Sequence, residues 1–440
     1  MDPEDSVRAL EATPGVRHAR QVIREFDALT LDEMCEIAAV PAPPFGERER
    51  ARLIADRMRN TGLERVRIDR VGNVLARYPL SGGPLSGSEQ AACHIGPAAG
   101  DVGEGPVLVA AHLDTVFPPD TRIDVRRDDG RIRAPGISDN ARGLAAMLAI
   151  ARALSVAGVR TGRRLVFVAT VGEEGEGDLR GVKHLFRDGS PWRAASGFVA
   201  LDGTGRSRIV HRALGCTRLR VTVAGPGGHS WADWGRANPV HALGAAIAAI
   251  AKLRLPRLPR SSLTVSRISG GTSVNAIPSS CSMEMDIRSE DAGVLAELEA
   301  GARSAVEKAV SRANAHRRRG TAALQTSFEI TGMRPGGETP PGAWIVRVAD
   351  AATRLLGAAP ELIAASTDAS TPISLGIPAI TLGVGGESGG THTTDEWYAN
   401  AGGPEGIERA LLTILGLTGV VAQPVSRTAP RRAPPSGPRG

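Results

Sequence analysis

Apolar and polar positions in the first half of the chain repeat in a way that is typical of an α/β sheet. Continuous apolar runs at 107–111, 165–171 and 198–201 predict short strands that are buried on both faces. The Ala- and Leu-rich stretch 143–154, between the first two runs, predicts a helix. Strands that alternate with helices indicate a mixed, mostly parallel sheet with helices on both faces.

The pattern changes near residue 214, where apolar and polar residues begin to alternate. Such alternation indicates strands with one solvated face, unlike the buried runs before them. Strands are expected at 217–223, 262–268, 281–288 and 324–330, and helices at 239–253 and 291–314. The resulting β-α-β-β-α-β order is that of a ferredoxin-like α+β domain.

These patterns divide the 440 residues into two domains, a number that suits the length of the chain. We expect the α/β domain at 17–214 and 332–422, and the ferredoxin-like domain as an insertion at 215–331. Residues 1–16 and the Arg- and Pro-rich tail 423–440 are expected to be disordered. The Gly-, Ser- and Pro-rich stretch 80–105 is expected to be a long surface loop.

Charge and composition narrow the class of protein. The net charge is +6, but much of the excess lies at 317–319 and in the tail, and aromatic residues make up only 3%, so we expect no nucleic-acid partner. No apolar run is long enough to span a bilayer, and the acidic N-terminus lacks the pattern of a signal peptide, so no membrane association is expected. Four scattered cysteines (35, 93, 216 and 281) favour a reduced, cytoplasmic protein.

Acidic residues and histidines follow the predicted strands. They form five clusters along the chain, which are His112-Leu113-Asp114, Asp139-Asn140, Glu173-Glu174, Asp202 and His392. Strand ends are where an α/β sheet presents its chemistry. Histidine, aspartate and glutamate are zinc ligands, and a carboxylate can bridge two ions. Together the clusters predict a site for two metal ions.

Each cluster also has a simpler explanation when it is taken alone. His112 and Asp114 point the same way in a strand, so Asp114 would orient the ring of a ligand, although such a pair is usually structural. Asp139 precedes a helix and would cap it. Glu173 and Glu174 point opposite ways in an extended chain, so one can bind metal while the other acts as a general base, or both can belong to a solvated acidic loop.

The remaining candidates lie in glycine-rich turns and on one strand. His392 lies among glycines that allow a close approach to a site, or that form a flexible turn. In the inserted domain, His229 and Asn275 lie in turns, where a surface histidine and a turn-stabilising asparagine are the simpler explanation. Arg288 lies on a strand two residues after Asp286, with which it can pair.

The motifs together resemble those of a known family. AAHLDTVFP, GISDNARG, TVGEEGEGDLRG, ALDG, GPGGHS, GGTSVNAIP, MDIRS and GGTHTTDEW are similar to the motifs of the dinuclear zinc aminopeptidases and aminoacylases. That family includes peptidase T, carboxypeptidase G, acetylornithine deacetylase and succinyl-diaminopimelate desuccinylase. The resemblance covers roughly residues 25–420 and is strongest to the peptidase T-like branch.

The resemblance implies a role for each site residue. It assigns His112, Asp139 and Asp202 to one zinc ion, and Asp139, Glu174 and His392 to the second, so that Asp139 bridges the two. Cobalt or manganese could replace zinc.

In the same resemblance, Asp114 orients a ligand and Glu173 is the general base that activates the water between the metals. His229 polarises the scissile carbonyl or holds the oxyanion, while Asn275 and Arg288 hold the polar end of the substrate.

The implied activity is hydrolysis of an amide bond in a small peptide or an N-acyl amino acid, most simply by a di- or tripeptide aminopeptidase. The resemblance also implies a homodimer formed through the inserted domain, which would close as a lid. An N-acyl amino acid deacylase or a glutamate-type carboxypeptidase is an alternative on the same scaffold. An inactive metal- or ligand-binding protein is an alternative from another class, and the presence of Glu173 argues against it.

Overall fold

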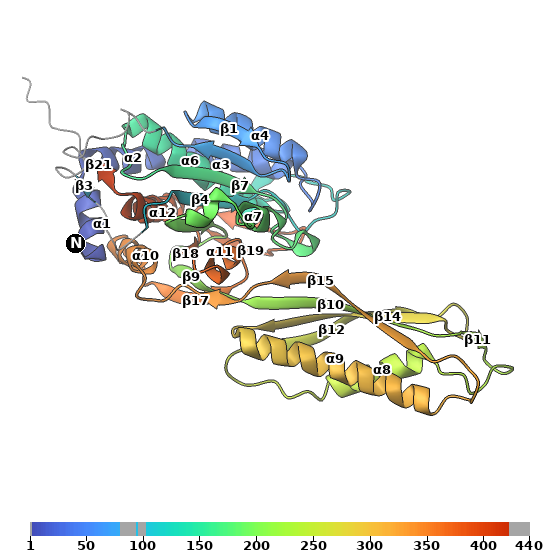
Figure 1. The fold of residues 1–440 in the computed structure, drawn as a ribbon. Coiled ribbons are helices and arrows are strands. Elements are labelled where there is room, and N and C mark those ends of the chain that lie inside the picture. Colours follow the sequence, from blue (N-terminus) through green and yellow to red (C-terminus); the bar gives the residue numbers. More distant parts are fainter. Residues whose placement is uncertain (1, 80–93, 96–102, 422–440) are drawn as a thin grey trace, which may run out of the picture.

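The computed structural model describes residues 2–79, 94–95 and 103–421, and it consists of a large α/β domain and a smaller α+β domain (Figure 1). The smaller domain extends away from the large one and is joined to it through β10 (Gly215–Ala224) and β15 (Gln325–Arg334). Each domain has its own hydrophobic core. Within the described residues, each helix is too short or too polar to cross a bilayer.

The large domain is built on a mixed sheet of nine strands. Eight follow one another in the order β1 (Glu64–Ile68), β2 (Val74–Arg77), β7 (Leu165–Thr170), β4 (Val107–His112), β8 (Gly197–Leu201), β18 (Ala379–Leu382), β9 (Arg208–Ala213) and β16 (Gly337–Glu338), and β17 (Glu361–Ala365) pairs with β9. The central strands β7, β4, β8 and β18 are parallel to their neighbours in this group. Their carboxyl ends therefore meet at one edge of the sheet.

Helices cover both faces of this sheet, as the sequence predicts. They are α1 (Pro3–Ala12), α2 (Pro14–Glu25), α3 (Asp27–Ala39), α4 (Arg48–Asn60), α6 (Arg142–Ala157), α7 (Arg180–Leu185), α10 (Trp344–Leu355), α11 (Ser370–Ser374) and α12 (Gly403–Thr418). Alternate residues of β4 enter different cores: Val109 packs in the cluster that contains α6 and α12, and Leu108 packs in the cluster that contains α7 and α11. This two-sided burial explains why the strand is apolar up to its last residue, His112.

The N-terminus differs from the expectation of disorder over 1–16, because α1 and the start of α2 are ordered there. The Asp2 carboxylate caps α1 by accepting from the Glu4 amide, and Pro3 occupies the first turn. Val7 and Leu10 are fully buried, and α1 packs against α10 and α12. The segment is mostly polar, so the sequence analysis missed its narrow apolar face, which is buried only by contact with other helices.

Two of the expected irregular segments lie mostly outside the described residues. Of the expected 80–105 loop, β3 (His94–Ile95) pairs with β21 (Val420–Val421) in an antiparallel ladder. The tail 423–440 lies outside the described residues. A further small sheet runs in the order β19 (Glu387–Gly389), β20 (Trp397–Ala399), β6 (Arg131–Arg133) and β5 (Arg126–Asp128). It brings the segment around residue 392 beside the segment that leads to residue 139.

The smaller domain has the β-α-β-β-α-β order that the sequence predicts. Its antiparallel sheet runs β12 (Ser261–Gly270), β14 (Ser280–Ser289), β10 and β15, with α8 (Pro239–Ile250) and α9 (Ala292–Ala315) on one face. Residues of β10 and β14 alternate between this helix-covered core and a polar, helix-free face. Strand β15 continues past the expected boundary at residue 331 to Arg334, whose side chain contacts Glu173 of the large domain. We call this smaller domain the lid, after the role that the resemblance implies for it.

Candidate metal centre

The five side chains expected to bind metal come from adjacent elements at one edge of the large sheet. His112 ends β4, Glu174 follows β7, and Asp202 follows β8, so the three neighbouring parallel strands present them together. Asp139 lies in a short irregular helix (Ile137–Ala141) that leads into α6. His392 follows β19 and adopts a left-handed backbone conformation with φ of 66°.

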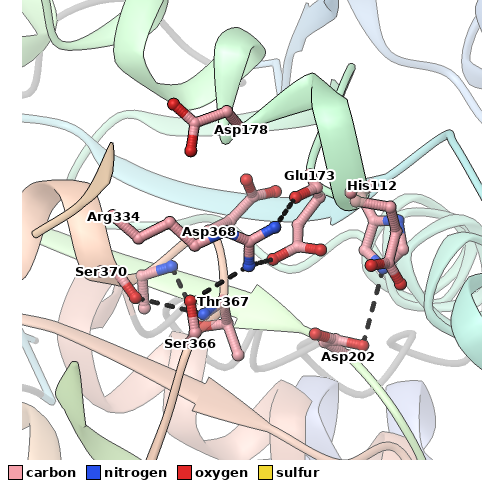
Figure 2. Close-up of polar contacts among 12 residues, drawn as sticks. His112, Glu173, Asp178, Asp202, Arg334, Ser366, Thr367, Asp368 and Ser370 are labelled. Atoms are coloured by element: carbon pink, nitrogen blue, oxygen red, sulfur yellow. Dashed lines mark hydrogen bonds and ion pairs between the residues drawn. The ribbon is translucent and has the colours of Figure 1, made fainter. Parts of the chain in front are cut away.

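The first half of the centre surrounds His112. Its Nε2 atom lies 3.0 Å from Asp139 Oδ1 and 3.7 Å from Asp202 Oδ1. The His112 side chain is only 2% exposed, and Figure 2 shows it facing Asp202. One imidazole and two carboxylates therefore converge on one point.

The second half surrounds His392. Its Nε2 atom lies 3.1 Å from Asp139 Oδ2 and 3.0 Å from Glu174 Oε1. Asp139 thus turns one carboxylate oxygen toward each histidine. A carboxylate in this position can bridge two ions, each of which would have one further carboxylate and one imidazole.

The chemistry of these donors fits metal ions. One ligand atom from each of His112, Asp139 and Glu174 lies within 4.8 Å of the others. Although His112 Nε2 and Asp139 Oδ1 are close, neither has a hydrogen bond of good geometry among the described residues, and both atoms are buried. The hydrogen bonds that the protonated His392 ring donates to Asp139 and Glu174 raise the pKa of His392 to about 10. A proton therefore occupies, in the metal-free protein, a place that a cation could take.

Glu396, which the sequence analysis missed, holds the segment that carries Asp139. It is fully buried, and its carboxylate accepts from the amides of Gly136 at 2.8 Å, Ser138 at 2.8 Å and Asp139 at 3.0 Å. The Ser138 hydroxyl donates to it as well, at 2.5 Å. Burial raises the pKa of Glu396 despite these bonds. The only sequence signal was its position four residues after His392, in the same motif.

Asp114 contacts the centre differently from the sequence expectation. The ring Nδ1 atom of His112 lies 3.0 Å from the main-chain carbonyl oxygen of Asp114 and 3.8 Å from its carboxylate. The carboxylate instead accepts from the amides of Glu173 at 2.9 Å and Glu174 at 2.7 Å. Burial raises its pKa to about 6. Asp114 therefore orients His112 through its backbone and the glutamate pair through its side chain.

The two glutamates diverge, as expected of neighbours in an extended chain. Glu174 reaches His392, while Glu173 Oε1 lies 3.0 Å from Arg334 Nη1 (Figure 2). Burial raises the pKa of Glu173 well above its usual range, and the opposing charge of Arg334 limits the rise. Asp368 lies beside this pair and is also buried, which raises its pKa to about 6.

Arg334 and Asp368 were not among the sequence candidates. Asp368 follows β17, so the same strand-end argument that found Asp202 would have found it. Arg334 carried no such signal, because the last lid strand was expected to end at residue 330.

The lid candidates are not gathered around the metal ligands. His229 ends β11 (Gly228–His229), which pairs with β13 (Ala276–Ile277) at the end of the lid remote from the large sheet (Figure 1). Asn275 lies beside it, since its carbonyl accepts from the Ser230 amide at 2.9 Å. The exposed His229 ring accepts through Nδ1 from the Trp231 and Ala232 amides at 3.2 Å and 3.4 Å. A neutral ring therefore carries its proton on Nε2, which can donate outward.

Arg288 lies near the opposite end of the lid. It faces Cys216 across the sheet, close to the junction with the large domain. Its guanidinium pairs with both Asp286 oxygens at 3.0 Å. Roughly seven residues of strand, or about 24 Å, separate this row from the turns that hold His229 and Asn275. The three residues therefore do not form one cluster in this conformation.

Comparison with known proteins agrees with this fold. A family model for peptidase family M20/M25/M40 matches residues 108–415, which is more than half of the chain. A provisionally named succinyl-diaminopimelate desuccinylase, DapE, from Mycobacterium tuberculosis is 27% identical over 201 residues. That alignment covers 44% of this chain and only 55% of the relative, so it spans about half of each protein.

Solved structures resemble nearly the whole chain. The aminopeptidase PepT from Bacillus cereus superimposes with a TM-score of 0.67 and 23% identity, over 88% of this chain and 98% of that one. A tripeptidase from Staphylococcus aureus gives a TM-score of 0.67 with 20% identity, over 88% and 97%. Human carnosine dipeptidase 1 gives 0.62 with 14% identity, over 92% and 99%. At these identities the likeness is one of fold.

Proposed function

The chain belongs to peptidase family M20/M25/M40, and we propose that it is a two-metal hydrolase that cleaves an amide bond in a small peptide or an N-acyl amino acid. One observation carries the proposal. The two oxygens of Asp139 lie 3.0 Å and 3.1 Å from the Nε2 atoms of His112 and His392, so one carboxylate serves two sets of ligands. A shared carboxylate of this kind favours a pair of ions over a single ion.

Zinc is the metal that best suits the proposed ligands, with cobalt or manganese as alternatives of the same chemistry. His112, Asp139 and Asp202 would hold one ion, and Asp139, Glu174 and His392 would hold the other. When bound, the two ions would lower the pKa of a water molecule to about 7 and polarise the scissile carbonyl.

Glu173 is the proposed general base. It lies beside a proposed ligand without contacting either histidine, and its carboxylate would take a proton from the attacking water and return it to the leaving amine. Burial raises the pKa of Glu173, and the ion pair with Arg334 offsets part of that rise in favour of the ionised carboxylate that a general base requires. Asp114 would hold Glu173 and Glu174 in place through their amides.

His229, Asn275 and Arg288 are proposed to bind the substrate after a movement of the lid. The Nε2–H group of His229 would donate to the scissile carbonyl oxygen or to the oxyanion that forms from it. Their present separation from the metal ligands means that this role requires either closure of the lid or the lid of a second copy. A homodimer formed through the lid is part of the proposal, and β12 is an edge strand with a largely exposed face that could pair with another copy.

A di- or tripeptide aminopeptidase is the substrate class we favour. The HLDTVFP and THT motifs support it, as does the fold shared with PepT and with a tripeptidase. An N-acyl amino acid deacylase or a glutamate-type carboxypeptidase is the second candidate, favoured by the partial match to DapE. The presence of Glu173 beside the full ligand set disfavours a non-catalytic binding protein. Free thiols at Cys35, Cys216 and Cys281 support a reducing compartment, and we propose the cytoplasm.

The test is a substrate screen of the zinc-loaded full chain. Dipeptides, tripeptides, N-acyl amino acids and C-terminal glutamate conjugates would be compared by release of free amine. We expect hydrolysis of free-amino di- or tripeptides that is lost on removal of zinc. Activity confined to N-acyl substrates would favour the deacylase proposal over the aminopeptidase proposal. No activity on any substrate of the screen would contradict the proposal that the protein is a hydrolase.

A further inference from the structure

The segment that follows β7 bonds directly to both strands on which the lid is mounted. It contains Glu173 and Glu174 and runs to α7 (Arg180–Leu185). From lid strand β10, the Arg218 guanidinium donates to the carbonyl of Gly175. From lid strand β15, Arg334 reaches Glu173. The loop that carries the proposed general base is therefore also the loop that meets the lid.

Asp178 fixes the far side of the same loop to β15. Its two carboxylate oxygens accept from the Met333 amide at 3.0 Å and 3.1 Å. Lys183 Nζ donates to the Met333 carbonyl at 2.8 Å and to Asp178 at 2.5 Å. Both main-chain polar groups of Met333 are thus held by the large domain, at the residue immediately before Arg334.

Arg334 grips Glu173 in two places. Nη1 lies 3.0 Å from Glu173 Oε1, and Nη2 donates to the Glu173 carbonyl. Nη1 also donates to Ser366 Oγ at 3.0 Å, in the segment that precedes Asp368 (Figure 2). The Arg334 side chain is only 7% exposed. A planar guanidinium that contacts both the side chain and the backbone of one residue fixes its orientation, which a lysine cannot do.

We propose that Arg334 is a positioning residue that couples the lid to Glu173. The inference rests on the proposed function, in which Glu173 is the general base. Because Arg334 ends a lid strand and holds Glu173 by its carboxylate and carbonyl, a rotation of β15 relative to the large sheet moves the carboxylate. The contacts of Asp178 with Met333 limit that rotation. The position of the lid and the position of the base are therefore set together.

The test compares four variants of the full chain. Arg334→Ala removes both contacts with Glu173, and Arg334→Lys keeps the positive charge without the planar guanidinium. Asp178→Ala loosens β15 without touching Glu173. Glu329→Ala is the matched control. Glu329 lies on the same strand, β15, and pairs with Arg220 at 3.0 Å on the exposed face of the lid sheet, so this variant also removes an arginine–carboxylate pair.

We expect Arg334→Ala to lower kcat by about 10²-fold, the loss that follows from a small misplacement of a catalytic group. KM and zinc content should stay near the wild-type values. Arg334→Lys should recover only part of kcat, Asp178→Ala should lower kcat to a smaller extent, and Glu329→Ala should match the wild type. A wild-type kcat in Arg334→Ala would overturn the inference. A rise in KM alone would also overturn it, because it would make Arg334 a substrate-binding residue.

Hydrogen exchange gives a readout that is independent of activity. Amides of 171–185 should exchange faster in Arg334→Ala and in Asp178→Ala than in the wild type or in Glu329→Ala. Unchanged exchange in both variants would overturn the coupling even if kcat fell. An inactive wild-type protein would contradict the proposed function instead, and the exchange comparison would still decide whether the lid strand and the loop are coupled.

Discussion

Replacing Glu396 by glutamine should weaken zinc binding without removing a zinc ligand. The fully buried carboxylate collects four hydrogen bonds from the segment 136–139, which carries Asp139. Three of these bonds end on Oε1 and one, from the Gly136 amide, ends on Oε2. A glutamine can keep its oxygen toward the three donors, but its NH₂ group must then face the Gly136 amide.

The size of the effect follows from this mismatch. A hydrogen bond to a charged group contributes about 1.5–3 kcal/mol, and a buried donor left without an acceptor adds a desolvation cost. The segment must shift to relieve the clash of donors, and Asp139 shifts with it. Loss of a group that orients a metal ligand typically weakens metal binding about 10–100-fold. We expect Glu396→Gln to fall in that range.

Competition with a chelator, followed by zinc analysis, measures the affinity, and thermal unfolding of the metal-free protein measures the stability. Glu408→Gln is the matched control. Glu408 is also fully buried, and it pairs with Arg20 at 2.8 Å and Arg24 at 2.5 Å, away from the metal ligands. The control should lose stability but keep the wild-type zinc affinity. Wild-type affinity in Glu396→Gln, or an equal loss in both variants, would refute the positioning role.

Three further predictions concern the site. Glu173→Gln should keep its zinc and lose about 10²–10⁴-fold in kcat, and a near-normal kcat would mean that another group accepts the proton. Because the pKa of His392 is raised to about 10 without metal and zinc binds only the neutral ring, zinc binding should release protons and tighten between about pH 6 and pH 8. Calorimetry in buffers of different ionisation enthalpy would detect that release, and an affinity independent of pH would contradict it. Arg288→Ala should lower kcat/KM for a free-carboxylate substrate by an amount that corresponds to about 1.5–3 kcal/mol of lost transition-state stabilisation, and by much less for the C-terminal amide of that substrate. Equal losses on the two substrates would make Arg288 only the partner of Asp286.

The parts of the site that could be predicted from the sequence are those that depend on where each strand ends. A buried strand ends at a definite residue, and parallel neighbours bring those ends to one edge, so His112, Glu174 and Asp202 could be placed together. The topology of the lid could also be predicted. Four segments with period-two alternation indicate strands and two segments with helical periodicity indicate helices, and few folds combine them in this order.

The parts that could not be predicted depend on contacts between distant residues. Arg334 lies 161 residues from Glu173, and Glu396 lies 258 residues from Ser138, so local patterns carry no sign of either pairing. Helix α1 was missed for a related reason, since its buried residues are few and their partners lie in α10 and α12. The separation of Arg288 from His229 follows from strand length and lid position, which depend on the tertiary structure.

The most direct test of the two-metal account is an anomalous difference map from crystals of the zinc-loaded protein, recorded at the zinc absorption edge. We predict two peaks about 3.5–4 Å apart, with Asp139 between them. His112 and Asp202 should flank one peak, and Glu174 and His392 should flank the other. A single peak, or no peak near Asp139, would contradict the account.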